Sequence, residues 1–131
     1  MTDLRNNLQR IRQSVNYTGV QNKNIHPSDI DAVLEFDSKY LLLFELKVKG
    51  NKIPLGQRLM LERIIDAWED SGKIGSIVYC EHTTPPDQDI MFKDCKVIGV
   101  YNRGESKAYR SDLREFLFNY GEKYNINKII A

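Results

Sequence analysis

Apolar residues near the start of the chain recur every three or four positions, which is the spacing of an amphipathic helix. This pattern predicts a helix over residues 3–15, with arginines on its outer face. Its apolar stripe consists of Leu4, Leu8, Ile11 and Val15. Residues 16–29 are polar and rich in turn-forming residues, so we expect mostly loop there, with a short strand near residues 17–20.

The next two apolar segments have the patterns of paired strands. Residues 30–36 alternate between apolar and polar side chains, whereas residues 40–48 begin with apolar side chains on both faces, as a central strand does. The apolar face of the first segment consists of Ile30, Ala32, Leu34 and Phe36. The sequence Asp-Ser-Lys at residues 37–39 suits a tight turn, so the two segments are predicted to form a β-hairpin.

The remainder of the chain alternates between helical and strand patterns. The predicted segments are a loop over 49–54, a helix over 55–70, a strand over 74–80, a loop over 81–89, a strand over 96–102 and a helix over 111–124. The inward stripes of the two helices consist of Leu61, Ile64, Ile65 and Trp68, and of Leu113, Phe116, Leu117, Tyr120 and Tyr124. Helices interspersed with strands predict a layered α/β domain with a mixed sheet.

Composition limits the classes of protein that fit this pattern. The chain has 131 residues, of which 41% are hydrophobic and 28% charged, so a single domain over residues 1–131 is predicted. A net charge of +1 excludes a histone-like protein that binds by bulk charge, but it leaves room for a local basic surface. No apolar run approaches the roughly 20 residues of a membrane span, and no signal-like segment begins the chain. Since Cys80 and Cys95 are expected to be reduced and buried, we expect a soluble, cytoplasmic protein without membrane partners.

Two charged residues interrupt the end of the most apolar strand. Glu45 and Lys47 follow a run of apolar residues, and their spacing of two places both side chains on one face of the strand. A central strand rarely carries unpaired charge, because burial of an isolated ion is costly. One interpretation is an ion pair between the two residues at a solvated strand end, and the other is a functional site.

The predicted hairpin favours the functional interpretation. If residues 37–39 form a three-residue loop, the register of the hairpin places Asp31 opposite Glu45. The same register places Asp29 opposite Lys47, and a loop of another length would change both pairs. Directly opposed Cβ atoms are about 5 Å apart, so two carboxylates there repel each other unless a cation or a proton lies between them. A hard divalent ion such as Mg²⁺ binds in this way, through one or two carboxylates with water and phosphate oxygens.

Gln57 extends the candidate site to the next helix. It lies on the buried stripe in the first turn of the helix over 55–70, so its amide is expected to face the sheet. The alternative is a glutamine that bonds local backbone where the helix starts. For Asp29, the alternative is a purely local role, because Pro27, Ser28 and Asp29 form a favourable turn sequence.

The stretch that contains these residues resembles the PD-(D/E)XK nuclease superfamily, and in particular its small phage-type, Holliday-junction-resolvase-like and VRR-NUC-like members. Those enzymes carry an aspartate at the start of one strand, a Glu-x-Lys at the end of the next strand, and often a glutamine on the following helix. The matching segments here are Pro27-Ser28-Asp29-Ile30-Asp31, Glu45-Leu46-Lys47 and Gly56-Gln57. Ser28 interrupts the Pro-Asp dipeptide, so either aspartate could be the one that the family uses. Asp31 is favoured because it directly precedes an apolar run and the hairpin register places it opposite Glu45, and Asp29 is the reserve candidate.

The resemblance implies both a fold and an activity. The implied fold is a restriction-endonuclease-like core of a helix, a mixed β-sheet with a catalytic hairpin, a helix and a strand, with an added strand and a C-terminal helix. The implied activity is that of a metal-dependent DNA endonuclease, selective for branched or junction DNA, in phage or in repair and recombination. The alternatives are a catalytically inactive nucleic-acid-binding or assembly protein of the same fold, and a small interaction module whose charges are surface pairs.

The resemblance further implies a role for each candidate residue. Asp31, Glu45 and the backbone carbonyl of Leu46 would bind Mg²⁺ or Mn²⁺, and the metal would lower the pKa of a bound water. Lys47 would orient that water or stabilise the transition state. Gln57 would position either Lys47 or the water.

Basic residues surround the acidic motif. Residues 47–63 carry several lysines and arginines against one acid, and the helix over 3–15 adds further positive charge. The residues expected to contact DNA phosphates are Lys49, Lys52, Arg58, Arg63, Arg5 and Arg12. An ordinary solvated basic face is the alternative. The tail at residues 125–131 has apolar residues without a predicted partner in the chain, which leaves a homodimer contact open.

Overall fold

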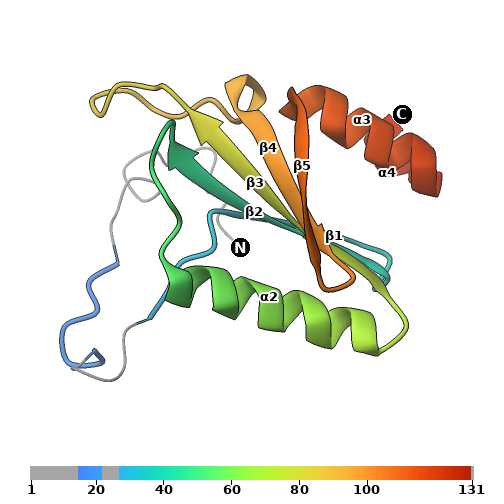
Figure 1. Cartoon of the computed structure of the whole chain (residues 1–131), viewed down its shortest axis with the longest axis horizontal. Helices are drawn as coiled ribbons and strands as arrows, with labels where there is room; N and C mark the ends of the chain where they lie inside the picture. The colour runs from blue at the N-terminus through green and yellow to red at the C-terminus, as the bar shows by residue number, and fades with distance from the viewer. Residues whose placement is uncertain (1–14, 22–26, 131) are drawn as a thin grey trace, which may run out of the picture.

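The computed structural model describes residues 15–21 and 27–130, in which helices lie on both faces of a β-sheet (Figure 1). The helix predicted over 3–15, with Arg5 and Arg12, lies outside the described residues except for Val15. The elements are β1 (Ala32–Phe36), β2 (Tyr40–Val48), α2 (Leu55–Asp70), β3 (Ile74–His82), the 3₁₀ helix η2 (Phe92–Asp94), β4 (Lys96–Asn102), β5 (Glu105–Asp112), α3 (Leu113–Tyr124) and α4 (Asn127–Ile130). Within the described ranges, no helix has both the length and the apolar character needed to cross a membrane.

The sheet has five strands in the order β1-β2-β3-β4-β5, so neighbours in sequence are also neighbours in space. β2 and β3 are parallel, and the other three adjacent pairs are antiparallel. Parallel neighbours need a crossover connection, and α2 supplies it between β2 and β3. As a result, the ends of β2 and β3 lie at the same end of the sheet as the start of α2 (Figure 1).

Alternation along β2 divides its side chains between two hydrophobic clusters, because successive residues of a strand point to opposite faces. Leu41 and Leu43 pack toward α2, and Leu42 and Phe44 pack toward α3. The buried residues under α2 are Leu41, Leu43, Leu61, Ile65, Ile77 and Tyr101. Those under α3 are Leu42, Phe44, Val78, Cys80, Cys95, Val97, Leu113, Phe116, Tyr120 and Ile126. The alternation therefore places Glu45 and Lys47 on the face of the sheet that α2 covers.

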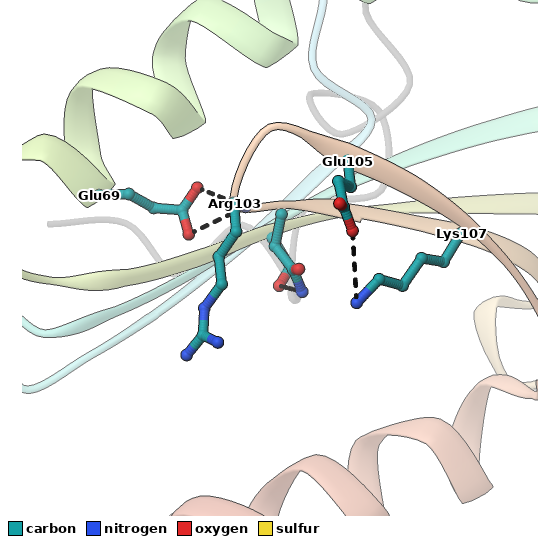
Figure 2. A network of polar contacts seen from close by, with 6 residues as sticks. Glu69, Arg103, Glu105 and Lys107 are labelled. Carbon is teal, nitrogen blue, oxygen red and sulfur yellow. Dashed lines mark hydrogen bonds and ion pairs between the residues drawn. The ribbon is translucent and has the colours of Figure 1, made fainter.

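The C-terminal half of α2 is held closely against the sheet. Gly75 permits this approach, because a Cβ atom there would lie 3.0 Å from Cδ1 of Trp68. The indole N–H of Trp68 donates a hydrogen bond of 2.9 Å to the carbonyl of Ile74. The carboxylate of Glu69 accepts from the backbone N–H of Arg103, at 3.0 and 3.3 Å, while the side chain of Arg103 extends away from α2 (Figure 2). These contacts fix α2 relative to β3 and to the β4–β5 turn.

Several predicted elements are confirmed. α2, β2 and β4 have the predicted bounds, and the mixed sheet of an α/β fold is present. β1 begins at Ala32, two residues later than predicted, and β3 continues two residues further than predicted, to His82. Cys80 and Cys95 are both free and buried, as predicted.

Three sequence predictions about local structure were wrong. β5 was not predicted, and it occupies the first two residues assigned to the last helix, which begins at Leu113. β5 is an edge strand with mostly exposed residues, so it lacks the apolar alternation by which strands are recognised. Residues 17–20 form a turn instead of a strand, since the N–H groups of Val20 and Gln21 both donate to the carbonyl of Tyr17. Ile64, assigned to the inward stripe of α2, is 37% exposed.

The C-terminal tail also differs from its prediction. Ile126 is only 4% exposed and belongs to the cluster under α3, and Ile129 packs against the same cluster. Asn125 ends α3 in a left-handed conformation that turns the chain back toward the sheet. These apolar residues therefore have partners within the chain, and the tail no longer favours a homodimer contact.

Candidate active site

The hairpin of β1 and β2 has the register that the three-residue loop predicts. Asp37 and Ser38 have φ values of 56° and 54°, and the N–H of Lys39 donates to the carbonyl of Phe36 at 3.0 Å. Positive φ at both central residues is typical of the turns that join hairpin strands. The ladder runs from Phe36 opposite Tyr40 to Ala32 opposite Phe44. It ends there, so Asp31 and Glu45 each lie one residue beyond the last pair.

Asp31 reaches across from β1 to the end of β2. Its Oδ2 atom accepts a hydrogen bond of 2.7 Å from the backbone N–H of Leu46. This contact takes the place of the next ladder bond and fixes the carboxylate beside the peptide that follows Glu45. A side chain 15 residues away in sequence is thereby held next to the Glu-x-Lys motif.

Glu45 is half-buried, and its surroundings oppose its negative charge. Burial is the largest cause that raises the pKa of its carboxyl group, and the nearby charge of Asp31 raises this pKa further. The side-chain amide of Gln57 opposes this shift, because Nε2 donates to Oε2 of Glu45 at 3.3 Å. The structure thus brings together the two carboxylates that the sequence analysis placed opposite each other.

Gln57 connects the helix to the hairpin. Its Nε2 atom donates a second hydrogen bond, of 2.6 Å, to the backbone carbonyl of Asp29. Pro54 occupies the N-cap position of α2 and makes no side-chain capping bond, so the first turn of the helix leaves Gln57 free to face the sheet. The amide therefore points into the site, as the helical stripe predicts, and does not cap its own helix.

The carboxylate of Asp29 has a different partner. Its Oδ1 atom accepts a hydrogen bond from the hydroxyl of Tyr17, and this bond is the largest cause of the raised pKa of that phenol. Asp29 contributes its backbone carbonyl to Gln57, whereas Asp31 contributes a carboxylate oxygen to the end of β2. The geometry thus favours Asp31 over Asp29 as the partner of Glu45.

Lys47 lies two residues beyond Glu45 and beside Glu81 of β3 in the parallel register. Among the described residues it forms no ion pair, so the structure does not contain the strand-end ion pair between Glu45 and Lys47. Lys47 instead lines a groove of about 340 Å³ next to the carboxylates. We call this the basic groove, and its lining residues are Lys47, Lys52, Ile53, Arg58, Tyr79, Ile98 and Gly99.

Tyr79 is a site residue that the sequence analysis missed. It is the β3 neighbour of Glu45, and its hydroxyl is buried without a hydrogen-bond partner in the part of the chain that the structure describes. Burial raises the pKa of the phenol to about 12, with the charge of Glu62 as the next cause and that of Arg58 opposing it. Only the pairing of β2 with β3 connects this tyrosine to the acidic motif.

The predicted DNA-binding residues fall into three groups. Lys52 and Arg58 line the basic groove, and Nε of Arg58 lies 3.3 Å from Oε2 of Glu62 on the same helix. Lys49 and Arg63 are exposed but do not line the groove. Arg5 and Arg12 lie outside the described residues.

The donor atoms fit a hard divalent cation. Two carboxylates are adjacent, and Mg²⁺ needs only one or two carboxylates when water and phosphate oxygens complete its coordination. No larger cluster is present, because residues 15–21 and 27–130 contain no group of three or more His, Cys, Asp or Glu side chains that could hold a metal ion. Two carboxylates are fewer ligands than a closed structural metal site uses.

Comparisons with known proteins do not identify a relative. No family model, curated protein or solved structure matches the chain. The function is therefore inferred from the arrangement of Asp31, Glu45, Lys47 and Gln57 and from the groove beside them.

Proposed function

We propose that this protein is a metal-dependent DNA endonuclease with a restriction-endonuclease-like core of the PD-(D/E)XK type. The observation that carries the proposal is the convergence of the Asp31 and Glu45 carboxylates from neighbouring strands, with the amide of Gln57 bound to Glu45. Adjacent like charges oppose folding, so a glutamate whose pKa is raised by burial and by a neighbouring carboxylate is typical of a functional site.

The proposed roles are those that the family resemblance implies, and the contacts of Asp31, Glu45 and Gln57 are compatible with them. Asp31, Glu45 and the carbonyl of Leu46 are the oxygen donors for Mg²⁺ or Mn²⁺, with Asp29 as the reserve candidate. The metal, when bound, lowers the pKa of a water and neutralises charge on the scissile phosphate. Lys47 lies on the same strand face as Glu45, where its ammonium group can donate to the attacking water or to the developing oxyanion.

Gln57 is proposed as a positioning residue. Its single amide nitrogen bonds both Glu45, at 3.3 Å, and the backbone at Asp29, at 2.6 Å. It therefore holds the orientation of the Glu45 carboxylate and the distance between the start of α2 and the hairpin. Loss of this amide would misplace a metal ligand without removing a charge.

The test is a cleavage assay with labelled branched, duplex and single-stranded DNA, in Mg²⁺, in Mn²⁺ and in EDTA. We expect metal-dependent cleavage of branched DNA that falls at least about 100-fold in Glu45→Gln and in Lys47→Met, as for loss of a transition-state contact. Glu105→Gln is the matched control, because this exposed glutamate pairs with Lys107 on β5, away from the carboxylate pair, and its substitution should leave activity unchanged. Metal-independent cleavage, or full activity in both site variants, would contradict the proposal.

A second pair of variants separates the two candidate aspartates. Asp31→Asn should abolish cleavage and weaken Mn²⁺ binding measured by calorimetry, because its carboxylate lies beside Glu45. Asp29→Asn should retain most activity, because its carboxylate bonds Tyr17 and its backbone carbonyl is unchanged. DNA binding without cleavage by the wild-type protein would instead support the catalytically inactive binding protein.

A further inference from the structure

We infer that the basic groove holds a single-stranded DNA segment and delivers it to the carboxylate pair, so that the substrate is DNA with a single-stranded branch. This inference rests on the proposed nuclease function and adds a substrate class to it. Three features of the groove carry it: its charge, its aromatic residue and its shape.

The charge of the groove suits a phosphate backbone. Lys47, Lys52 and Arg58 come from β2, from the loop after it and from the start of α2, and none of the described residues that line the groove is acidic. Glu62 holds one nitrogen of Arg58 from the helix side at 3.3 Å, which leaves the rest of the guanidinium for other acceptors. Cations from three elements around one groove match the spaced phosphates of a strand better than a single small anion.

The aromatic residue of the groove distinguishes single strands from duplexes. Proteins that bind single strands combine a positive groove with aromatic rings on which exposed bases stack, whereas the bases of a duplex are already stacked on each other. Among the described residues, Tyr79 is the only aromatic residue that lines the groove. Its hydroxyl is buried and lacks a partner within those residues, so the ring of Tyr79 is the part that we assign to base stacking.

The shape of the groove depends on Gly99. This residue pairs with Tyr79 across β3 and β4, and a Cβ atom at Gly99 would lie 3.9 Å from the Tyr79 ring. Both ladders of β4 are irregular next to this pair. The ladder with β3 shifts its register between Tyr79 and Cys80, and the ladder with β5 shifts between Val97 and Gly99. The absence of a side chain thus keeps space open over the ring, in a groove of about 340 Å³ that suits one strand.

The groove adjoins Glu45, although neither carboxylate lines it. Two of its lining residues border Glu45, because Lys47 lies two residues further along β2 and Tyr79 is the direct β3 neighbour of Glu45. A strand that lies along the groove therefore reaches the carboxylates without crossing another element of the sheet. Cleavage would then occur where a single-stranded branch enters the site.

The test is equilibrium binding measured by fluorescence anisotropy in EDTA, where no metal-dependent cleavage occurs. The probes are an oligothymidylate, a duplex of the same length and an oligouridylate. We expect the wild-type protein to bind single-stranded DNA at least about tenfold more tightly than the duplex, and more tightly than the RNA. Equal or tighter binding of the duplex, or tighter binding of the RNA, would overturn the inference.

The variants locate the binding surface. Lys52→Gln and Arg58→Gln should each weaken single-strand binding and reduce the salt dependence by about 0.7 in the log–log slope. Tyr79→Leu should weaken it by about fivefold to a hundredfold, the range for loss of one stacked base. Lys107→Gln is the control, because Lys107 lies on β5, is paired with Glu105 (Figure 2) and does not line the groove. An equal loss in Lys107→Gln would overturn the inference.

The outcomes separate this inference from the proposed nuclease activity. A single-strand preference lost in Lys52→Gln, together with no cleavage in any metal, supports the groove and contradicts the nuclease. Metal-dependent cleavage with a preference for duplex contradicts the groove and leaves the nuclease intact. Far-UV circular dichroism of each variant verifies folding, and Lys52 lies in an exposed loop where substitution leaves the core untouched.

Discussion

At the scale of single residues, the candidate site contains two groups whose surroundings oppose their chemistry. Glu45 carries a charge that both burial and Asp31 oppose. Among the described residues, the hydroxyl of Tyr79 is buried without a partner, whereas that of Tyr101, on the same face of the sheet, donates to Asp66 at 2.8 Å. Unsatisfied buried groups cost stability, and the hydroxyl of Tyr120 is a second one in the core under α3, so the unpaired Tyr79 supports a functional site only together with the adjacent carboxylates.

The raised pKa of Glu45 predicts a pH dependence of stability for the metal-free protein. The folded state binds the Glu45 proton more tightly than the unfolded state does, so protonation of Glu45 stabilises the folded protein. This contribution to stability is fully present below the ordinary glutamate pKa. It is lost as the pH rises through the raised pKa of the folded state. Glu45→Gln should therefore be more stable than the wild type at neutral pH, with little difference at acidic pH.

The measurement is urea denaturation in EDTA at several pH values. Glu105→Gln is the control, because no such burial acts on this exposed residue. A wild-type protein that gains stability relative to Glu45→Gln as the pH rises would contradict the direction of the shift.

At the scale of elements, α2 determines the geometry of the site. Its first turn carries Gln57 and Arg58, and its last turn is held by Trp68 and Glu69. Between them, Leu61 is fully buried against β2 and β3. A displacement of this helix would therefore move both the Gln57 amide that bonds Glu45 and the Arg58 side chain that lines the basic groove.

The packing of α2 predicts a contrast between two aliphatic side chains on the helix. Leu61→Ala should lower the free energy of unfolding by about 2–5 kcal/mol, because Leu61 has no exposed surface and its loss leaves a cavity. Ile64→Ala should cost about 1 kcal/mol or less, since Ile64 is 37% exposed. Chemical denaturation followed by circular dichroism measures both, and equal costs would contradict the observed orientation of the helix.

At the scale of the whole molecule, the sheet separates two hydrophobic cores and its end carries the candidate site. The core under α2 supports the site directly, and the core under α3 includes the C-terminal tail through Ile126. β2 contributes to both cores, so each stabilises the strand that ends in Glu45 and Lys47. The tail is therefore part of the fold that holds the site.

This arrangement predicts that the tail contributes to global stability. Ile126→Ala should lower the free energy of unfolding by about 2–5 kcal/mol, because the side chain is 4% exposed within the core. Lys128→Ala should change it by about 0.5 kcal/mol or less, since its contact with Asp37 is an exposed ion pair of 3.6 Å. Thermal and urea unfolding measure both, and an unchanged stability of Ile126→Ala would show that the tail is not part of the core.

The elements that were predicted correctly are those whose structure is set by residues close together in sequence. The helix over residues 55–70 follows from its apolar spacing and from the Ser71-Gly72 pair that ends it. The hairpin register follows from the length of one turn, and it was sufficient to bring Asp31 toward Glu45. Two features were missed because they depend on a partner strand that no local pattern identifies. β5 forms by pairing with β4, and Tyr79 lies at the site because β3 pairs with β2.

By itself, the sequence determined where the main helices and strands form, and it determined that Glu45 and Lys47 share one face of a strand. These depend on the geometry of a helical turn or a strand, which a few adjacent residues set. Only the tertiary structure decided that the carboxylate of Asp29 bonds Tyr17, that Tyr79 borders the site, and that Ile126 completes the core. The physical reason is that each of these contacts joins side chains far apart in sequence, whose approach depends on the packing of the whole sheet.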